Sequence, residues 1–138
     1  MTSTTTTDAA PDHLAQLRAI NDSAAFNRWA GFEVLTAEPG RVELGLEWRD
    51  DFGQYAGFLH AGMTSAMLDT VCGFAAVTQV GRVMASNLSV CFVAAAAGER
   101  FRTVGEVVKP GRRQAFTRAE LFATVAGGGE KLVATATT

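Results

Sequence analysis

The chain has 138 residues, of which 12 are basic and 14 are acidic, so its formal net charge is −2. This length fits one compact domain, and the small negative charge excludes the basic excess that non-specific binding to nucleic acid or to an anionic membrane requires. Charged residues make up 19% of the chain, below the roughly 25% of typical soluble domains. The low charge predicts that part of the surface is buried between subunits.

The N-terminal residues 1–11 are rich in threonine and have neither a positive start nor an apolar stretch, so they predict a disordered tail and not a secretory signal. The longest uncharged segments, residues 52–68 and 83–98, are shorter than the roughly 18 to 20 apolar residues that span a bilayer. We therefore expect no membrane partner and a cytoplasmic location.

Cysteine and histidine are too sparse to form a metal cluster. Cys72 and Cys91 lie inside apolar stretches and not in a spaced framework, which predicts two reduced core thiols. His13 and His60 lie far apart in the chain, so we expect no metal site.

The first part of the chain predicts a helix and a hairpin. Residues 12–30 carry apolar side chains at helical spacing, with Asp12 able to cap the start and Gly31 to end the helix. Residues 32–37 and 41–48 flank a Pro-Gly turn, and apolar and charged side chains alternate in the second run. This alternation is typical of a half-buried strand.

A loop at residues 50–59 precedes a predicted buried helix over residues 60–80, which ends at Gly81. Four strand-like runs follow at residues 83–95, 100–109, 113–125 and 131–138. Their short connections predict an antiparallel meander. The fold class is therefore α+β: residues 12–138 form a single domain in which an antiparallel sheet of about six strands wraps around one long central helix.

The central helix has two different faces. Large side chains share one stripe and predict the face that packs on the sheet: Met63, Met67, Val71, Phe74 and Val77. Small side chains surround Asp69 on another face: Gly62, Ser65, Ala66, Gly73 and Ala76. Burial of an unpaired carboxylate costs several kcal/mol, so Asp69 either reaches solvent or an arginine, or acts as a base or nucleophile in a groove for a slender ligand.

The start of the same helix offers backbone N–H groups without helical partners, at Gly57, His60, Ala61 and Gly62. These groups predict an oxyanion hole about two turns from Asp69, on the same side of the helix. For His60 two roles remain open, a helix cap and a direct part in orienting the substrate.

One segment of this chain resembles the hot-dog fold acyl-CoA thioesterases of the phenylacetic-acid-degradation (PaaI-like) group. The matching residues are Gln54-x-x-Gly57-x-x-His60-Ala61-Gly62, Leu68-Asp69 and Gly73-x-Ala75, and residues 86–93 and 105–112 look like strands of that group. The similarity extends from about Phe26 to the C-terminus. It implies a hot-dog fold and a thioester hydrolase without metal or cofactor.

The resemblance also implies a role for each site residue. Asp69 would be the base or nucleophile, the N–H of Ala61, eight residues earlier, would bind the thioester carbonyl, and the Gln54 amide, fifteen residues earlier, would orient the reactants. The group usually reads His-Gly-Gly where this chain reads His60-Ala61-Gly62. Alanine keeps the N–H donor if the backbone there has no positive φ.

Further expectations concern substrate and partners. Gly57, Ser65 and Ser86 are candidate substrate contacts; the serine or threonine that relatives place at the next strand falls at Ala85, one residue before Ser86. The resemblance implies a homodimer whose active sites combine Asp69 of one chain with the Gln54 loop of the other, and its further assembly to a homotetramer.

Six basic residues lie between Arg100 and Arg118. They are either solvent-facing, or the turn with Lys109, Arg112 and Arg113 binds the phosphates of coenzyme A. Two other functions stay open, a non-catalytic acyl-CoA binding module and a hot-dog acyl-thioester dehydratase or hydratase. The second uses a histidine with its carboxylate, and none follows Asp69 closely.

Overall fold

The computed structural model describes residues 10–138, so most of the predicted tail, residues 1–9, lies outside the described residues. The chain begins with helices α1 (His13–Ser23) and α2 (Ala25–Ala30). The Asp12 carboxylate accepts a hydrogen bond from the Ala15 N–H at 3.0 Å, which confirms the predicted N-cap. Gly31, with φ 78°, ends α2.

The prediction of one helix over residues 12–30 is wrong, because Ala24 has extended backbone angles and separates α1 from α2. Two buried asparagines explain the break. The Asn27 side chain donates to the Asn21 side chain at 3.0 Å, and Asn21 donates to the carbonyl of Phe32 at 2.7 Å. A straight helix would place Asn21 and Asn27 on different faces, where this buried network could not form.

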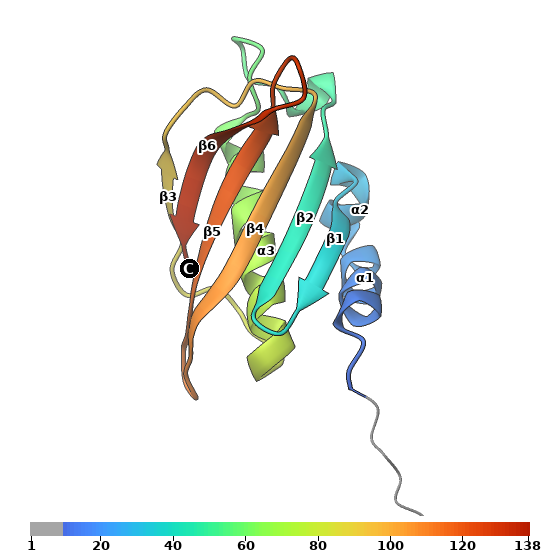
Figure 1. The fold of residues 1–138 in the computed structure, drawn as a ribbon, viewed down its shortest axis with the longest axis vertical. Helices are drawn as coiled ribbons and strands as arrows, with labels where there is room; N and C mark the ends of the chain where they lie inside the picture. Colours follow the sequence, from blue (N-terminus) through green and yellow to red (C-terminus); the bar gives the residue numbers. More distant parts are fainter. Residues whose placement is uncertain (1–9) are drawn as a thin grey trace, which may run out of the picture.

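One antiparallel sheet of six strands contains β1 (Glu33–Glu38), β2 (Arg41–Glu47), β3 (Ser89–Phe92), β4 (Arg100–Pro110), β5 (Ala115–Thr124) and β6 (Glu130–Thr137). The spatial order is β1-β2-β4-β5-β6-β3. Helix α3 (Ala61–Val80) lies along one face of this sheet (Figure 1). The α+β prediction of about six strands around one long helix is confirmed.

The predicted meander of the last four strands is wrong at its first member. Strands β4, β5 and β6 follow one another, but β3 pairs with β6 at the far edge, because β2 and β5 already occupy both sides of β4. The predicted strand over residues 83–95 shortens to the four residues of β3. Before it, residues 82–88 form an exposed strap, and within the described part of the chain this strap makes no backbone hydrogen bond.

The predicted stripe on α3 does face the sheet. Met67 and Val71 are fully buried, and Met63 and Phe74 nearly so. The helix can approach closely because β4 carries Gly105 opposite Val71, where a Cβ atom would lie 2.6 Å from the Val71 carbonyl oxygen. The two long elements therefore share one continuous core.

The two edges of the sheet differ. Beside β1 lie α1 and α2 (Figure 1), the Arg18 guanidinium donates to the Val34 carbonyl at 3.2 Å, and a bulge interrupts the β1 pairing after Val34. The β3 edge has no such cover within residues 10–138, and Phe92 and Val93 there are 54% and 51% exposed. Cys72 is buried as predicted, but Cys91 is exposed because it lies on this open edge.

Candidate active site

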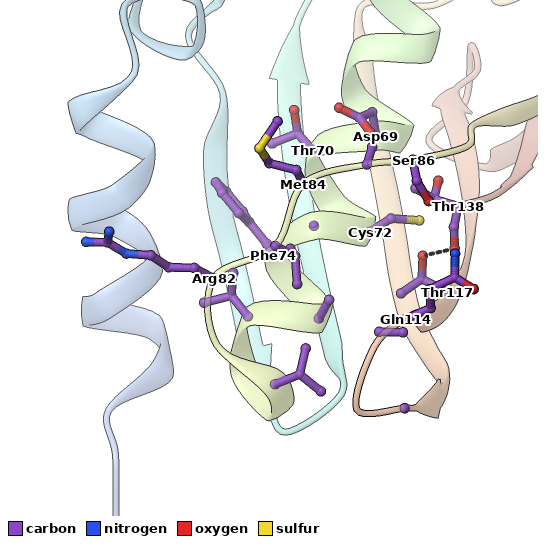
Figure 2. Close-up of a pocket in the computed structure, with 18 of the residues that line it drawn as sticks. Asp69, Thr70, Cys72, Phe74, Arg82, Met84, Ser86, Gln114, Thr117 and Thr138 are labelled. Atoms are coloured by element: carbon purple, nitrogen blue, oxygen red, sulfur yellow. Dashed lines mark hydrogen bonds between the residues drawn. The ribbon is translucent and has the colours of Figure 1, made fainter.

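Asp69 lies at the middle of α3 and faces a cavity of about 740 Å³. The strap 82–88 crosses over this cavity with Met84 and Ser86 (Figure 2). Arg112 and Arg113, in the turn between β4 and β5, also line it. The small residues Gly73 and Ala76 of α3 also line it. Of the small residues predicted to form a groove around Asp69, these two line the cavity, whereas Gly62, Ser65 and Ala66 do not.

The Asp69 carboxylate is partly buried, and this desolvation raises its pKa above the ordinary value. Within residues 10–138 no side chain forms a hydrogen bond or ion pair with it, so the arginine partner considered from the sequence is absent there. Its oxygens are therefore available to a ligand or to water in the cavity.

Cys72 lies one turn after Asp69 and lines the same cavity. Burial is the largest influence on this thiol and raises its pKa; hydrogen bonding with Thr117 and Thr138 acts in the opposite direction, and the charge of Asp69 raises the pKa further. The raised pKa disfavours the thiolate form of Cys72, which is the nucleophilic form of a cysteine.

Gln54 begins a tight hairpin loop. The Gly57 N–H donates to the Gln54 carbonyl at 3.0 Å, and the Gln54 N–H donates to the Phe58 carbonyl at 2.8 Å. Gly57 has φ 83°, the left-handed conformation that this kind of loop needs at its third residue. The side-chain oxygen of Gln54 accepts from the Ala56 N–H, so the loop is held from both sides.

The predicted oxyanion hole is mostly occupied by the chain itself. The N–H groups of Gly57, His60 and Gly62 donate to the Gln54 carbonyl, the Phe52 carbonyl and Nδ1 of His60, respectively. His60 therefore acts as the helix cap, at 2.8 Å from the Gly62 nitrogen. Ala61 has no positive φ, and its N–H has no partner among the described residues, so one donor remains.

The two halves of the predicted site lie apart in a single chain. Gln54, His60 and Ala61 line a second cavity of about 330 Å³, together with Phe92 after β3. Eight helical residues separate Ala61 from Asp69, which is about 12 Å along the axis. A carbonyl bound at Ala61 is thus out of hydrogen-bond reach of Asp69 in the same chain, against the expectation that both serve one carbonyl from one side of the helix.

The remaining candidates are divided. Ser86 and the two turn arginines line the Asp69 cavity. Four others line neither cavity: Gly57, Gly62, Ser65 and Lys109.

The six basic residues between Arg100 and Arg118 form two groups. The strand arginines pair across the sheet: Arg100 with Glu47, Arg102 with Glu43 and Glu130, and Arg118 with Glu106. The others, Lys109, Arg112 and Arg113, have no carboxylate partner within the described residues. Arg102 is half-buried and the other five side chains are exposed, so the solvent-facing interpretation fits both groups, and only the turn group lacks carboxylate partners among the described residues.

Sequence reasoning missed Met84, which lies over the Asp69 cavity and is 94% exposed. Met84 fell inside the predicted strand 83–95. The available signal was the run Arg82 to Leu88, which lacks the alternation of apolar and polar residues seen in β2.

Comparison with known proteins identifies the family. The family model of the thioesterase superfamily matches residues 56–127, which is more than half of the chain and includes Ala61 and Asp69. The chain belongs to the thioesterase superfamily. A solved structure of a thioesterase family protein from Silicibacter pomeroyi is 35% identical, with a TM-score of 0.86 over 91% of this chain and 93% of that one.

Two further solved structures extend the likeness of this thioesterase superfamily chain. Zebra fish thioesterase superfamily member 2 is 30% identical, with a TM-score of 0.76 over 90% of this chain and 91% of that one. The E. coli PaaI protein from the phenylacetic acid degradation operon is 17% identical and shares the fold, with a TM-score of 0.81 over 91% and 89%. No curated protein matches the chain. Among the described residues, no helix is both long and apolar enough to span a bilayer.

Proposed function

We propose that this superfamily member is an acyl-CoA thioesterase, which hydrolyses a thioester to a free acid and coenzyme A. The observation that carries the proposal is the Asp69 carboxylate, which lies unpaired in a large cavity on α3 of a thioesterase fold. Asp69 takes a proton from water, the water oxygen bonds to the acyl carbon, and the C–S bond breaks as the sulfur accepts a proton. Direct attack by Asp69, through an anhydride that water then opens, uses the same atoms.

Two other groups complete the chemistry. The free N–H of Ala61, at the positive end of the α3 dipole, hydrogen-bonds the carbonyl oxygen as negative charge develops on it. The Gln54 side chain orients the water or the carbonyl from its rigid loop.

The proposed site joins two chains, and the open β3 edge supports this. The strap before β3 lines the Asp69 cavity, and Phe92 at the end of β3 lines the Gln54 cavity. Antiparallel partners run in opposite directions, so two copies that pair through β3 about a two-fold axis place the start of one β3 beside the end of the other. The Asp69 cavity of each chain then faces the Gln54 cavity of its partner.

The same proposal assigns the coenzyme A phosphates to the turn between β4 and β5. Arg112 and Arg113 line the Asp69 cavity and have no carboxylate partner among the described residues, and Lys109 precedes them at the end of β4. Guanidinium groups bind phosphate oxygens in pairs. Ser86, at the cavity mouth, is a further candidate contact.

The experiment that tests the function is steady-state release of free thiol from a panel of aryl-CoA and fatty acyl-CoA thioesters. Asp69→Asn keeps the side-chain volume but removes the base, so kcat is expected to fall at least about 100-fold. Asp22→Asn on the exposed surface of α1 is the matched control and should leave kcat unchanged.

Two outcomes would contradict the proposal. If the wild type binds acyl-CoA but releases no thiol, the chain is a non-catalytic acyl-CoA binding module. If Asp69→Asn retains full activity with the wild-type fold, the base lies elsewhere.

A further inference from the structure

Tyr55 is the most exposed large apolar side chain within the described residues, and a rigid backbone holds it there. The Tyr55 side chain is completely exposed, with a relative accessible surface of 102%. The loop hydrogen bonds of Gln54 on both sides of it, and the positive φ of Gly57, fix the tip of the hairpin. Because the loop backbone is already constrained, only the side-chain rotamers of Tyr55 have to be ordered when the ring makes a contact, which lowers the entropy cost of binding there.

The second most exposed large apolar side chain is Met84, at 94%. It lies on the strap over the Asp69 cavity (Figure 2). The next, Val108, is 60% exposed. Tyr55 lines the Gln54 cavity. The two most exposed large apolar side chains thus lie at the two cavities that form the proposed shared site, Tyr55 at one and Met84 at the other.

The β3 pairing described above brings these two side chains toward each other from different chains. We propose that Tyr55 of one chain enters the Asp69 cavity of its partner and forms, with Met84 of the partner subunit, the wall that contacts the acyl group. The inference rests on the proposed function, because it requires the Gln54 loop and Asp69 of opposite chains to share a site. Tyr55 is then a specificity-determining residue that acts across the interface.

The chemistry of such a wall favours flat acyl groups. An aromatic ring stacked or set edge-on against a phenol is stabilised by more than the area it buries, and a thioether contacts an aromatic ring favourably at about 5 Å. A flexible alkyl chain gains only the buried area and loses rotamer freedom. The shorter the acyl group, the less of this wall it can contact, so the hydrolysis of the shortest substrate reports mainly on the rest of the site.

The test compares kcat/KM of the wild type, Tyr55→Ala and Tyr55→Phe for three thioesters: benzoyl-CoA, hexanoyl-CoA and the shortest acyl-CoA that the wild type turns over. For Tyr55→Ala we expect about a 10-fold loss with benzoyl-CoA, a smaller loss with hexanoyl-CoA and none with the shortest substrate. Tyr55→Phe keeps the ring and should retain the wild-type ratios. Phe26→Ala removes an exposed ring from α2 and should change none of them.

An equal loss with all three substrates would overturn the proposal, because it would make Tyr55 a structural residue of the loop or of the interface. Unchanged ratios in Tyr55→Ala would overturn it as well. The failure of the proposed function is a separate result, since it appears as a wild type without thiol release or as an active Asp69→Asn.

Hybrid assemblies decide whether Tyr55 acts across the interface. Chains that carry Asp69→Asn and chains that carry Tyr55→Ala are co-expressed with different affinity tags and purified on both tags. Across the interface, the only live site combines an intact Asp69 with an intact Tyr55, so the substrate ratios of the wild type are expected. If Tyr55 serves its own chain, the live site shows the Tyr55→Ala ratios, and this overturns the assignment.

Discussion

The Asp69 carboxylate combines chemical use with a cost to folding. Desolvation raises its pKa, which brings a base closer to the pH at which it works. No described side chain offsets the burial. A group of this kind is typical of an active site, where stability is given up for reactivity.

The raised pKa has a defined consequence for the pH profile. The base must be ionised, so kcat/KM is expected to fall as the pH drops through the raised pKa, above the range near 4 of an exposed carboxyl. A profile that stays flat down to that ordinary range would contradict the role of Asp69.

The stability of the folded chain should rise as the pH falls, whereas the activity should decrease. Because folding raises the pKa of Asp69, the ionised group destabilises the folded chain above that pKa, and this penalty disappears as the pH falls through it. Asp69→Asn is therefore expected to raise Tm at pH 8, with a gain that shrinks as the pH is lowered. Thermal unfolding at several pH values measures this, and Asp22→Asn should show no such trend.

Residue identities and spacings predicted which residues belong to the candidate site, but not which of their N–H groups lack a hydrogen-bond partner. The distances in sequence from Asp69 back to Ala61 and Gln54 are visible in the chain. The sequence does not show that the N–H groups of Gly57 and Gly62 form local hydrogen bonds, because these bonds depend on the loop conformation and on the His60 rotamer. The structure was therefore needed to show that, of the four predicted oxyanion-hole donors, the N–H of Ala61 is the one without a hydrogen-bond partner among the described residues.

At the scale of elements, local sequence patterns predicted the individual helices and strands better than the pairing of strands that are distant in the chain. The hairpin of β1 and β2 and the bounds of α3 agree with alternation and capping signals. The place of β3 depends on which strand edges remain free once β2 has paired with β4, a long-range outcome that no local period contains.

The turn between β4 and β5 is tight and carries two arginines. A Cβ atom at Gly111 would lie 2.2 Å from the Gln114 carbonyl oxygen, so the chain folds tightly there, and the exposed residues Arg112 and Arg113 of this turn line the Asp69 cavity. Among the described residues these two arginines have no carboxylate partner, unlike the strand arginines, which pair with neighbouring glutamates.

Arg112→Ala is expected to raise KM about 10-fold for an acyl-CoA, since charge-assisted contacts to phosphate contribute about 1.5–3 kcal/mol each. The loss should weaken at high salt. With the same acyl group on N-acetylcysteamine, which lacks the phosphates, KM should not change. Arg118→Ala, on a strand and paired with Glu106, is the matched control; an equal effect of both substitutions would contradict the assignment.

At the scale of the whole molecule, the surface divides into a neutralised face and an apolar edge. The outer face of the sheet carries arginines and glutamates that pair with one another: Arg41, Arg100, Arg102 and Arg118 with Glu43, Glu47, Glu106 and Glu130. The exposed apolar side chains of β3 and the strap lie elsewhere: Val83, Met84, Leu88, Phe92 and Val93. Exposed apolar side chains thus gather at the β3 edge, where the proposed pairing of two copies would bury them.

Cys91→Lys tests the assembly without touching either cavity. A lysine on an edge strand opposes pairing with another strand, so the variant is expected to shift to monomers and to lose most of its thioesterase activity. Light scattering after size exclusion and thiol release measure both. Thr36→Lys on the protected β1 edge should change neither, and a fully active Cys91→Lys monomer would contradict the shared site.

The unequal edges of the sheet also set how far such pairing can go. A sheet whose two edges can each accept a strand from another copy permits endless addition of copies, which leads to fibres. Here Arg18, the bulge after Val34 and the two N-terminal helices block one side, so each chain has a single valency in the plane of the sheet. In the proposed dimer the free β3 edges of the two copies pair with each other, so no further strand can be added.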